Sequence, residues 1–178
     1  MNIAVYCASK SGNSPEYMKF AREIGERIAK DGHTLVYGGS NIGLMGAVAS
    51  GVLDNGGKVI GVVPDVEYIK SVHYEGLTET IYTKDMADRR SKMIELADAC
   101  ITLPGGPGTL DEISEVICLN RLCITNIPVA FVNIKGYYDT LNAFFEKMYE
   151  CDFAERDAMG KILTSDSIDK IFDFIGEK

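Results

Sequence analysis

The sequence predicts a doubly wound α/β fold, with a mostly parallel sheet and helices on both of its faces. Three observations support this prediction. Short apolar runs alternate with longer amphipathic stretches along the chain. Glycine-rich turns stand between strands and helices, as in folds that bind ligands at the carboxyl ends of parallel strands. Three of the apolar runs are continuous, which is typical of strands covered on both faces: Ile3–Val5, Val59–Val63 and Val129–Val132.

The length of 178 residues suits one domain that spans residues 1–178. Hydrophobic residues make up 46% and charged residues 25%, which argues against a disordered chain or a small disulfide scaffold. The net charge of −8 repels nucleic acid and anionic lipid, so neither is an expected partner. A small anionic ligand would need a local site built from a few Arg or Lys side chains or from backbone N–H groups.

The sequence also gives no reason to expect a membrane segment, a leader or a metal. No apolar run reaches the roughly 18 to 20 residues of a membrane helix, and no basic region precedes an apolar stretch at the N-terminus. The five cysteines lack a C-x-x-C pair, which favours reduced, buried thiols in a cytoplasmic protein. The histidines, His33 and His73, are too few and too scattered for a metal site.

Strand and helix signals alternate in the first half of the chain. Asn2–Ala8 is expected to be a buried strand. Ser14 and Pro15 supply the N-cap and first turn of a helix that ends near Lys30. Residues 64–78 have no clear period and are expected to form a loop with at most one helical turn. The other elements expected here are strands at His33–Tyr37, Lys58–Val63 and Glu79–Thr83 and a small-residue helix at Gly43–Asn55.

The second half continues this alternation without an internal repeat or a linker. Pro104–Gly108 is expected to be a rigid turn between a strand and a helix. The strands expected here are Ala99–Leu103 and Pro128–Asn133, and the helices are Asp85–Ala97, Thr109–Leu122, Tyr137–Cys151 and Ser167–Ile175.

Two glycine-rich turns stand out, Gly38–Gly46 (GGSNIGLMG) and Pro104–Thr109 (PGGPGT). Missing side chains let the backbone approach a ligand, and free N–H groups at a helix start attract an anion. Neither turn has the Lys-Ser/Thr pair of a Walker loop or the G-x-G-x-x-G spacing, so dinucleotide binding is disfavoured. One such turn alone is equally well a tight connection, whereas two in one domain favour phosphate binding.

Charged residues flank the second turn. Arg89 and Arg90 lie in the helix before it, and Asp111, Glu112 and Glu115 lie in the helix after it. Adjacent residues point about 100° apart on a helix, so one arginine is expected to reach the crevice at the strand ends while the other pairs elsewhere. Solvated ion pairs and favourable charges at a helix N-terminus explain the same residues. A guanidinium suits phosphate oxygens, and a carboxylate beside such a turn suits the sugar of a nucleotide.

These segments resemble the LONELY GUY (LOG) family of cytokinin riboside 5′-monophosphate phosphoribohydrolases, once labelled possible lysine decarboxylases. The similar segments are Gly38–Gly46, Met86–Arg90 (MADRR) and Pro104–Glu112 (PGGPGTLDE). The last of them fits the family's P-G-G-x-G-T-x-x-E motif at every fixed position. The similarity extends from the first strand through Gly136–Asp139, which is most of the chain.

The resemblance implies a Rossmann-like fold, a homodimer, and hydrolysis of a nucleoside 5′-monophosphate to free base and ribose 5-phosphate without metal or organic cofactor. The substrate would be AMP or a cytokinin riboside 5′-monophosphate. The family's catalytic arginine falls on Arg89 and its catalytic glutamate on Glu112. The implied substrate-binding residues are Gly39, Ser40, Gly43, Met86, Arg90, Gly105, Gly106, Gly108 and Thr109.

This chemistry agrees with the residue types. N-glycosidic cleavage passes through an oxocarbenium-like state that a nearby carboxylate stabilises. Glu112 is therefore expected to stabilise charge or act as a base, and Arg89 to orient phosphate or ribose or to assist the leaving base. The chain departs from the family pattern at Ala87, Pro107 and Cys118–Cys123, which leaves the preferred base open.

Three other functions compete with this interpretation. A nucleotide-binding module without turnover would use the same turns and Arg89, but it has little use for a carboxylate at Glu112. A decarboxylase that uses pyridoxal phosphate is disfavoured, because no lysine occupies a Schiff-base motif. A partner-binding scaffold would use the apolar helix Ile113–Leu122, which serves a core or a dimer equally well.

Overall fold

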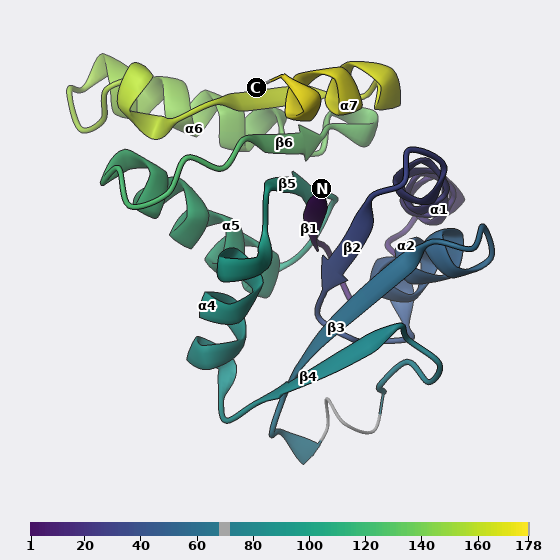
Figure 1. The fold of residues 1–178 in the computed structure, drawn as a ribbon. Coiled ribbons are helices and arrows are strands. Elements are labelled where there is room, and N and C mark those ends of the chain that lie inside the picture. The colour runs from purple at the N-terminus through teal and green to yellow at the C-terminus, as the bar shows by residue number, and fades with distance from the viewer. Residues whose placement is uncertain (68–71, 178) are drawn as a thin grey trace.

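A seven-stranded sheet forms the centre of the molecule (Figure 1). The structure, a computed structural model, describes residues 1–67 and 72–177. The strands lie in the order β4-β3-β2-β1-β5-β6-β7, and each neighbouring pair is parallel. Their bounds are β1 Asn2–Tyr6, β2 Thr34–Tyr37, β3 Lys58–Pro64, β4 Glu79–Thr83, β5 Ala99–Thr102, β6 Val129–Val132 and β7 Ile162–Ser165. The predicted doubly wound α/β fold is confirmed.

Helices cover both faces of this sheet and bury two separate apolar clusters. One face carries α1 (Pro15–Lys30), α2 (Gly43–Leu53) and α7 (Ile168–Gly176), and the other carries α4 (Met86–Leu96), α5 (Pro107–Arg121) and α6 (Asp139–Glu150). Two short 3-10 helices lie at Ile134–Gly136 and Asp157–Met159. Within the described ranges, every helix is too short or too polar to cross a membrane.

The continuous apolar runs of the sequence are strands with both faces buried. In β1, Ile3 and Val5 pack against one layer of helices, and Ala4 and Tyr6 pack against the other. A strand whose two faces are both covered needs apolar residues at every position, which explains the absence of alternation.

Small residues explain the close approach of α1 and α2, which lie side by side in Figure 1. A Cβ at Gly25 would lie 2.2 Å from the carbonyl oxygen of Val48, and one at Gly51 would lie 2.3 Å from that of Arg22. The two helix backbones therefore touch at a contact that only glycine permits. This contact fixes α2, whose first residues, Gly43–Gly46, belong to the first glycine-rich turn.

The structure differs from the sequence prediction in several elements. Strand β7 was not predicted, because its four half-buried residues at the sheet edge give too short a signal. Helix α2 ends at Leu53 rather than at Asn55, and α5 begins at Pro107, inside the predicted rigid turn. The sequence prediction allowed one helical turn within residues 64–78. Of this segment, residues 68–71 lie outside the described residues.

The structure contradicts the prediction that the cysteines are buried for three of the five. All five are free thiols, but only Cys7 and Cys100 are buried. Cys118, Cys123 and Cys151 are exposed, because α5 and α6 turn their outer faces and C-terminal ends to solvent. The apolar character of a segment does not show which side of a helix each residue occupies.

The order of the strands determines where a ligand can bind. On one side of β1 lie β2, β3 and β4, in that order. After β4 the chain crosses back over the sheet, and β5 lies on the other side of β1. The connections that follow β1 and β5 therefore diverge to opposite faces of the sheet. In open parallel sheets this divergence leaves a crevice at the carboxyl ends of the two strands.

Candidate active site

A cavity of about 490 Å³ lies at this crevice, within the size range of small-ligand pockets. Four segments that are distant in the sequence form its wall. They are the end of β1 with the residues after it (Val5, Cys7–Lys10), the first glycine-rich turn with the start of α2 (Gly38, Ser40, Ile42, Met45), part of α4 (Met86, Arg89), and the second turn with the start of α5 (Gly106–Thr109, Asp111, Glu112). Val72 completes the lining.

A buried ion pair stands in the wall of this cavity. Arg89 Nη1 donates to Glu112 Oε1 at 2.6 Å, and the two residues are only 6% and 8% exposed. Arg89 Nε also donates to the carbonyl oxygen of Val62 at 3.2 Å, which ties the guanidinium to β3. Because each charge compensates the other in a poorly solvated site, the pair is held in one geometry facing the cavity.

Burial changes the acidity of the groups in the site. It raises the pKa of Glu112 above that of a free glutamate, although Arg89 opposes the shift. A general base works best when its pKa is near the operating pH, and a raised pKa brings a carboxyl closer to neutral pH. Burial also raises the pKa of the Cys7 thiol well above its usual range, so this cysteine is not an activated nucleophile.

Gly38 provides the space that the arginine occupies. A Cβ at this position would lie 1.9 Å from Arg89 Nη2 and 2.5 Å from Met45 Cε. The guanidinium therefore requires a glycine at this position, directly after β2.

We expect Gly38→Ala to displace Arg89 and to reduce turnover at least tenfold, since misplacing a group by about 1 Å costs up to about 10²-fold. The measurement is the rate of the reaction that the family resemblance implies, release of base from a nucleoside 5′-monophosphate. Gly176→Ala is the control, because a Cβ at that position meets no atom within 4 Å. Equal rates for Gly38→Ala and the unmodified protein would contradict this role of the glycine.

The second glycine-rich turn leads into the N-terminus of α5. Gly106 is the N-cap residue and Pro107 the first helical residue, whose missing N–H is no loss there. The N–H groups that follow point out of the helix start, where the helix dipole favours an anion. A Cβ at Gly105 would lie 2.1 Å from Thr109 Oγ1, so this glycine lets the turn close over the Thr109 side chain.

The structure brings most of the predicted site residues together. Seven of them line the cavity: Ser40, Met86, Arg89, Gly106, Gly108, Thr109 and Glu112. Gly39, Gly43 and Gly105 do not line the cavity, but they permit close contacts between the turns and neighbouring residues. A Cβ at Gly39 would lie 2.5 Å from Val63 Cγ2, and one at Gly43 would lie 2.3 Å from the backbone of Ser9. Lys10 lines the cavity as well, and the sequence patterns gave no reason to select it.

Arg90 lies outside the cavity lining. Its Nε donates to Glu115 Oε2 at 2.8 Å, and its Nη1 lies 3.2 Å from Asp111 Oδ2. The expectation that the adjacent arginines serve different partners is confirmed, because Arg89 reaches the crevice and Arg90 ties α4 to α5. The substrate-binding role of Arg90 stays a prediction.

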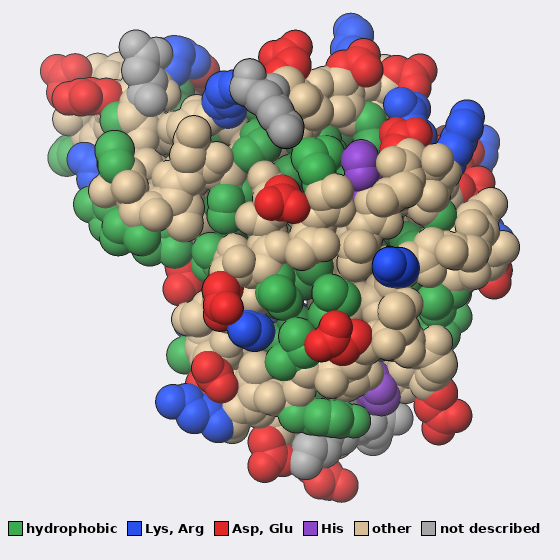
Figure 2. Space-filling view, viewed as in Figure 1, with side chains coloured by type: hydrophobic (Ala, Val, Ile, Leu, Met, Phe, Trp, Pro, Cys, Tyr) green, Lys and Arg blue, Asp and Glu red, His purple; other side chains and the backbone are tan. Residues whose placement is uncertain are grey.

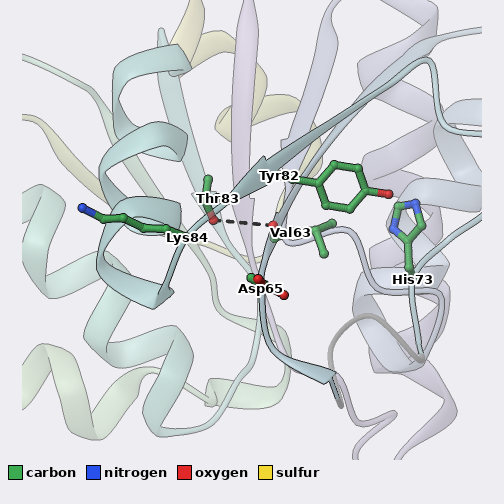
Figure 3. Close-up of a pocket in the computed structure, with 6 residues that line it drawn as sticks. All are labelled: Val63, Asp65, His73, Tyr82, Thr83 and Lys84. Atoms are coloured by element: carbon green, nitrogen blue, oxygen red, sulfur yellow. Dashed lines mark hydrogen bonds between the residues drawn. The ribbon is translucent and has the colours of Figure 1, made fainter.

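A second hollow of about 520 Å³ lies beyond Gly39, at the ends of β3 and β4 (Figure 3). Among the described residues, its lining is Val63, Asp65, His73, Tyr82, Thr83 and Lys84. Figure 3 shows the Lys84 side chain extending away from Asp65 and His73, so the charged groups do not converge. Tyr82 is largely exposed, whereas the first cavity is lined by the buried Arg89–Glu112 ion pair. The first cavity is therefore the candidate active site.

The surroundings of the site suit a small anionic ligand rather than an extended one. On the face seen in Figure 2, Lys and Arg side chains are interspersed with Asp and Glu, and a continuous basic surface is not visible there. Among the charged residues that line the cavity, Lys10 and Arg89 are balanced by Asp111 and Glu112, so binding of an anion there would depend on the N–H groups at the start of α5. In residues 1–67 and 72–177, no three His, Cys, Asp or Glu side chains gather closely enough to hold a metal ion.

Comparison with known sequences identifies relatives over nearly the whole chain. The sequence profile of a protein family described as "Possible lysine decarboxylase" matches residues 45–175. The probable cytokinin riboside 5′-monophosphate phosphoribohydrolase LOG4 of Oryza sativa subsp. japonica is 39% identical over 93% of this chain and 72% of its own length. Cytokinin riboside 5′-monophosphate phosphoribohydrolase LOG1 of Arabidopsis thaliana is 37% identical over 97% of this chain and 83% of its own length.

Solved structures of lower sequence identity share the fold. The molybdenum cofactor carrier protein of Chlamydomonas reinhardtii superimposes with a TM-score of 0.74 at 20% identity, over 99% of this chain and 98% of that chain. The molybdenum cofactor binding protein of Rippkaea orientalis gives 0.72 at 23% identity, over 98% and 96%. These similarities support the α/β fold.

Proposed function

Because the chain belongs to the LOG family, we propose that it is a phosphoribohydrolase that splits a nucleoside 5′-monophosphate into free base and ribose 5-phosphate. The observation that supports this most is the buried Arg89–Glu112 pair facing a cavity beside the glycine-rich start of α5. The phosphate is proposed to bind at the turn Gly105–Thr109 and the ribose beside Glu112. In this proposed arrangement, a carboxylate lies beside the ribose and an anion site lies beside the phosphate of the same substrate.

The proposed reaction breaks the bond between C1′ of the ribose and the base, and water supplies the new hydroxyl. Positive charge develops on the ribose as the base leaves with the bonding electrons. The Glu112 carboxylate stabilises this charge and accepts a proton from the attacking water. The departing base takes up a proton from solvent, and Glu112 returns its proton to solvent, so that the elements of water are divided between ribose 5-phosphate and the free base. Arg89 holds the carboxylate in place, and the phosphate contacts supply binding energy at a distance from the breaking bond.

The pH dependence of kcat/KM tests the state of Glu112. The carboxylate is the active form, so activity is retained above the pKa of Glu112 and lost as pH falls through it. Because burial raises that pKa, we expect the acid limb to fall at a pH above about 4.3, the value for a free glutamate. A profile that stays flat down to about pH 4 would contradict the proposed role.

The base is proposed to be adenine or an N6-modified adenine. Much of the remaining lining is apolar, with Val5, Ile42, Met45, Val72 and Met86 available to a planar base or an alkyl substituent. Turnover of AMP and of isopentenyladenosine 5′-monophosphate is followed by chromatography of free base and ribose 5-phosphate. Release from both nucleotides supports a broad hydrolase, and release from AMP alone excludes a cytokinin-activating role. Binding without release would favour the nucleotide-binding module.

We also propose that two copies associate through the outer face of α5. Leu110 and Cys118 lie eight residues apart on this helix, and its C-cap residue Leu122 follows four residues later; all three are exposed. Ile124, in the turn that follows, is 65% exposed. This apolar strip belongs to the helix that carries Glu112, so association would support the wall of the site.

Light scattering after size-exclusion chromatography tests the dimer. The unmodified protein is expected to have twice the mass of one chain, and Leu122→Asp is expected to yield the single-chain mass at micromolar concentration. A single-chain mass for the unmodified protein would contradict the proposal. Phe153→Asp serves as a control, since Phe153 is exposed but lies outside α5.

A further inference from the structure

The carbonyl groups of four consecutive residues where the second glycine-rich turn begins, Leu103 to Gly106, all have partners within the protein. Tyr138 donates its hydroxyl to Leu103 O at 2.7 Å, and the Ala8 N–H donates to Pro104 O at 3.2 Å. Tyr137 donates its hydroxyl to Gly105 O at 2.5 Å, and the Leu110 N–H donates to Gly106 O. Each of these peptides is therefore held through its oxygen.

A hydrogen bond that fixes the carbonyl oxygen of a peptide group also fixes the direction of the N–H in the same group. The peptide between Gly105 and Gly106 is planar and trans, so the Gly105 carbonyl and the Gly106 N–H point in opposite directions. The carbonyl points to Tyr137, which is not part of the cavity lining, whereas Gly106 is. The bond to Tyr137 therefore fixes the direction of the N–H of Gly106, a residue that lines the cavity.

The loop that carries Tyr137 is itself fixed. Asn133 Oδ1 accepts from the Tyr138 N–H at 2.7 Å, and Asn133 Nδ2 donates to Asp139 Oδ1 at 2.8 Å. The Tyr137 ring meets Tyr17 and Tyr138 edge to face, at centroid distances of 6.3 and 5.0 Å. Tyr137 is nevertheless 44% exposed, so burial does not require its hydroxyl to have a protein partner.

We propose that Tyr137 is a positioning residue for the substrate phosphate: its hydroxyl holds the Gly105 carbonyl so that the Gly106 N–H is aimed at the anion. This inference rests on the proposed function and adds to it a residue from the loop after β6. The glycines that give the turn its close approach also leave it free to rotate. The tyrosine removes that freedom before the ligand arrives.

Tyr137→Phe tests this role because it keeps the ring contacts and removes only the hydroxyl. Losing one neutral hydrogen bond predicts about a 3- to 10-fold rise in KM for AMP and in the inhibition constant of ribose 5-phosphate. The inhibition constant of adenosine, which lacks the phosphate, and kcat are expected to change less than twofold. Tyr17→Phe is the matched control, since it alters the neighbouring ring and leaves the Gly105 bond intact.

Unchanged constants for AMP and ribose 5-phosphate would overturn the inference, as would equal weakening of ribose 5-phosphate and adenosine. If the unmodified protein releases no base, the hydrolase proposal fails, and calorimetric titration of both proteins with AMP then decides the role of Tyr137. Weaker AMP binding by Tyr137→Phe would still support the positioning role. Absence of AMP binding by the unmodified protein would overturn both proposals.

Discussion

Glu112→Gln is expected to lower the rate of base release by about 10²- to 10⁴-fold, the range typical for loss of a positioned acid or base. The amide keeps the shape of the side chain and a hydrogen-bond acceptor for Arg89 Nη1. It supplies neither the negative charge proposed to stabilise the oxocarbenium-like state nor the proposed acceptor for the proton of water. The measurement is kcat for AMP under saturating conditions, with the melting temperature as a check of folding.

Glu115→Gln provides the matched comparison on the same helix. Glu115 lies one turn further along α5, pairs with Arg90 at 2.8 Å, and does not line the cavity. Its conversion to the amide is expected to change kcat less than threefold. Similar losses for the two variants would show that α5 needs its charges for structure, and a wild-type rate for Glu112→Gln would remove Glu112 from the mechanism.

Arg89→Met is expected both to abolish turnover and to lower the free energy of unfolding by about 3–5 kcal/mol, because it leaves the Glu112 carboxylate buried without its partner. Urea denaturation at neutral pH measures the loss. Without the guanidinium the pKa of Glu112 in the folded protein rises further, so the folded state binds a proton more readily. The stability deficit is therefore expected to shrink as pH falls.

The double variant Arg89→Met/Glu112→Leu separates structure from catalysis. Replacing both partners of a buried pair by apolar side chains of similar size is often neutral or stabilising. We expect this variant to regain most of the stability lost by Arg89→Met while remaining inactive. A double variant as unstable as the single one would show that Arg89 stabilises the protein through its bond to Val62 O instead.

The fold and much of the site could be predicted because they depend on local patterns. Continuous apolar runs predict strands buried on both faces, and glycines before helices predict turns that accept an anion. The 100° step of a helix predicts the separate directions of Arg89 and Arg90. The short edge strand β7 and the exposure of three cysteines could not be predicted in this way. Both depend on what packs beside a segment rather than on its own residues.

The sequence by itself determined the order of the principal strands and helices, the two glycine-rich turns, and the residue types available for chemistry. Only the tertiary structure decided which of these residues meet. It placed Arg89 against Glu112, sent Arg90 to Asp111 and Glu115, and brought Tyr137 to Gly105. The partners in these bonds are 21 to 32 residues apart in the chain. Contacts over such separations arise from strand order and helix packing, which no local periodicity encodes.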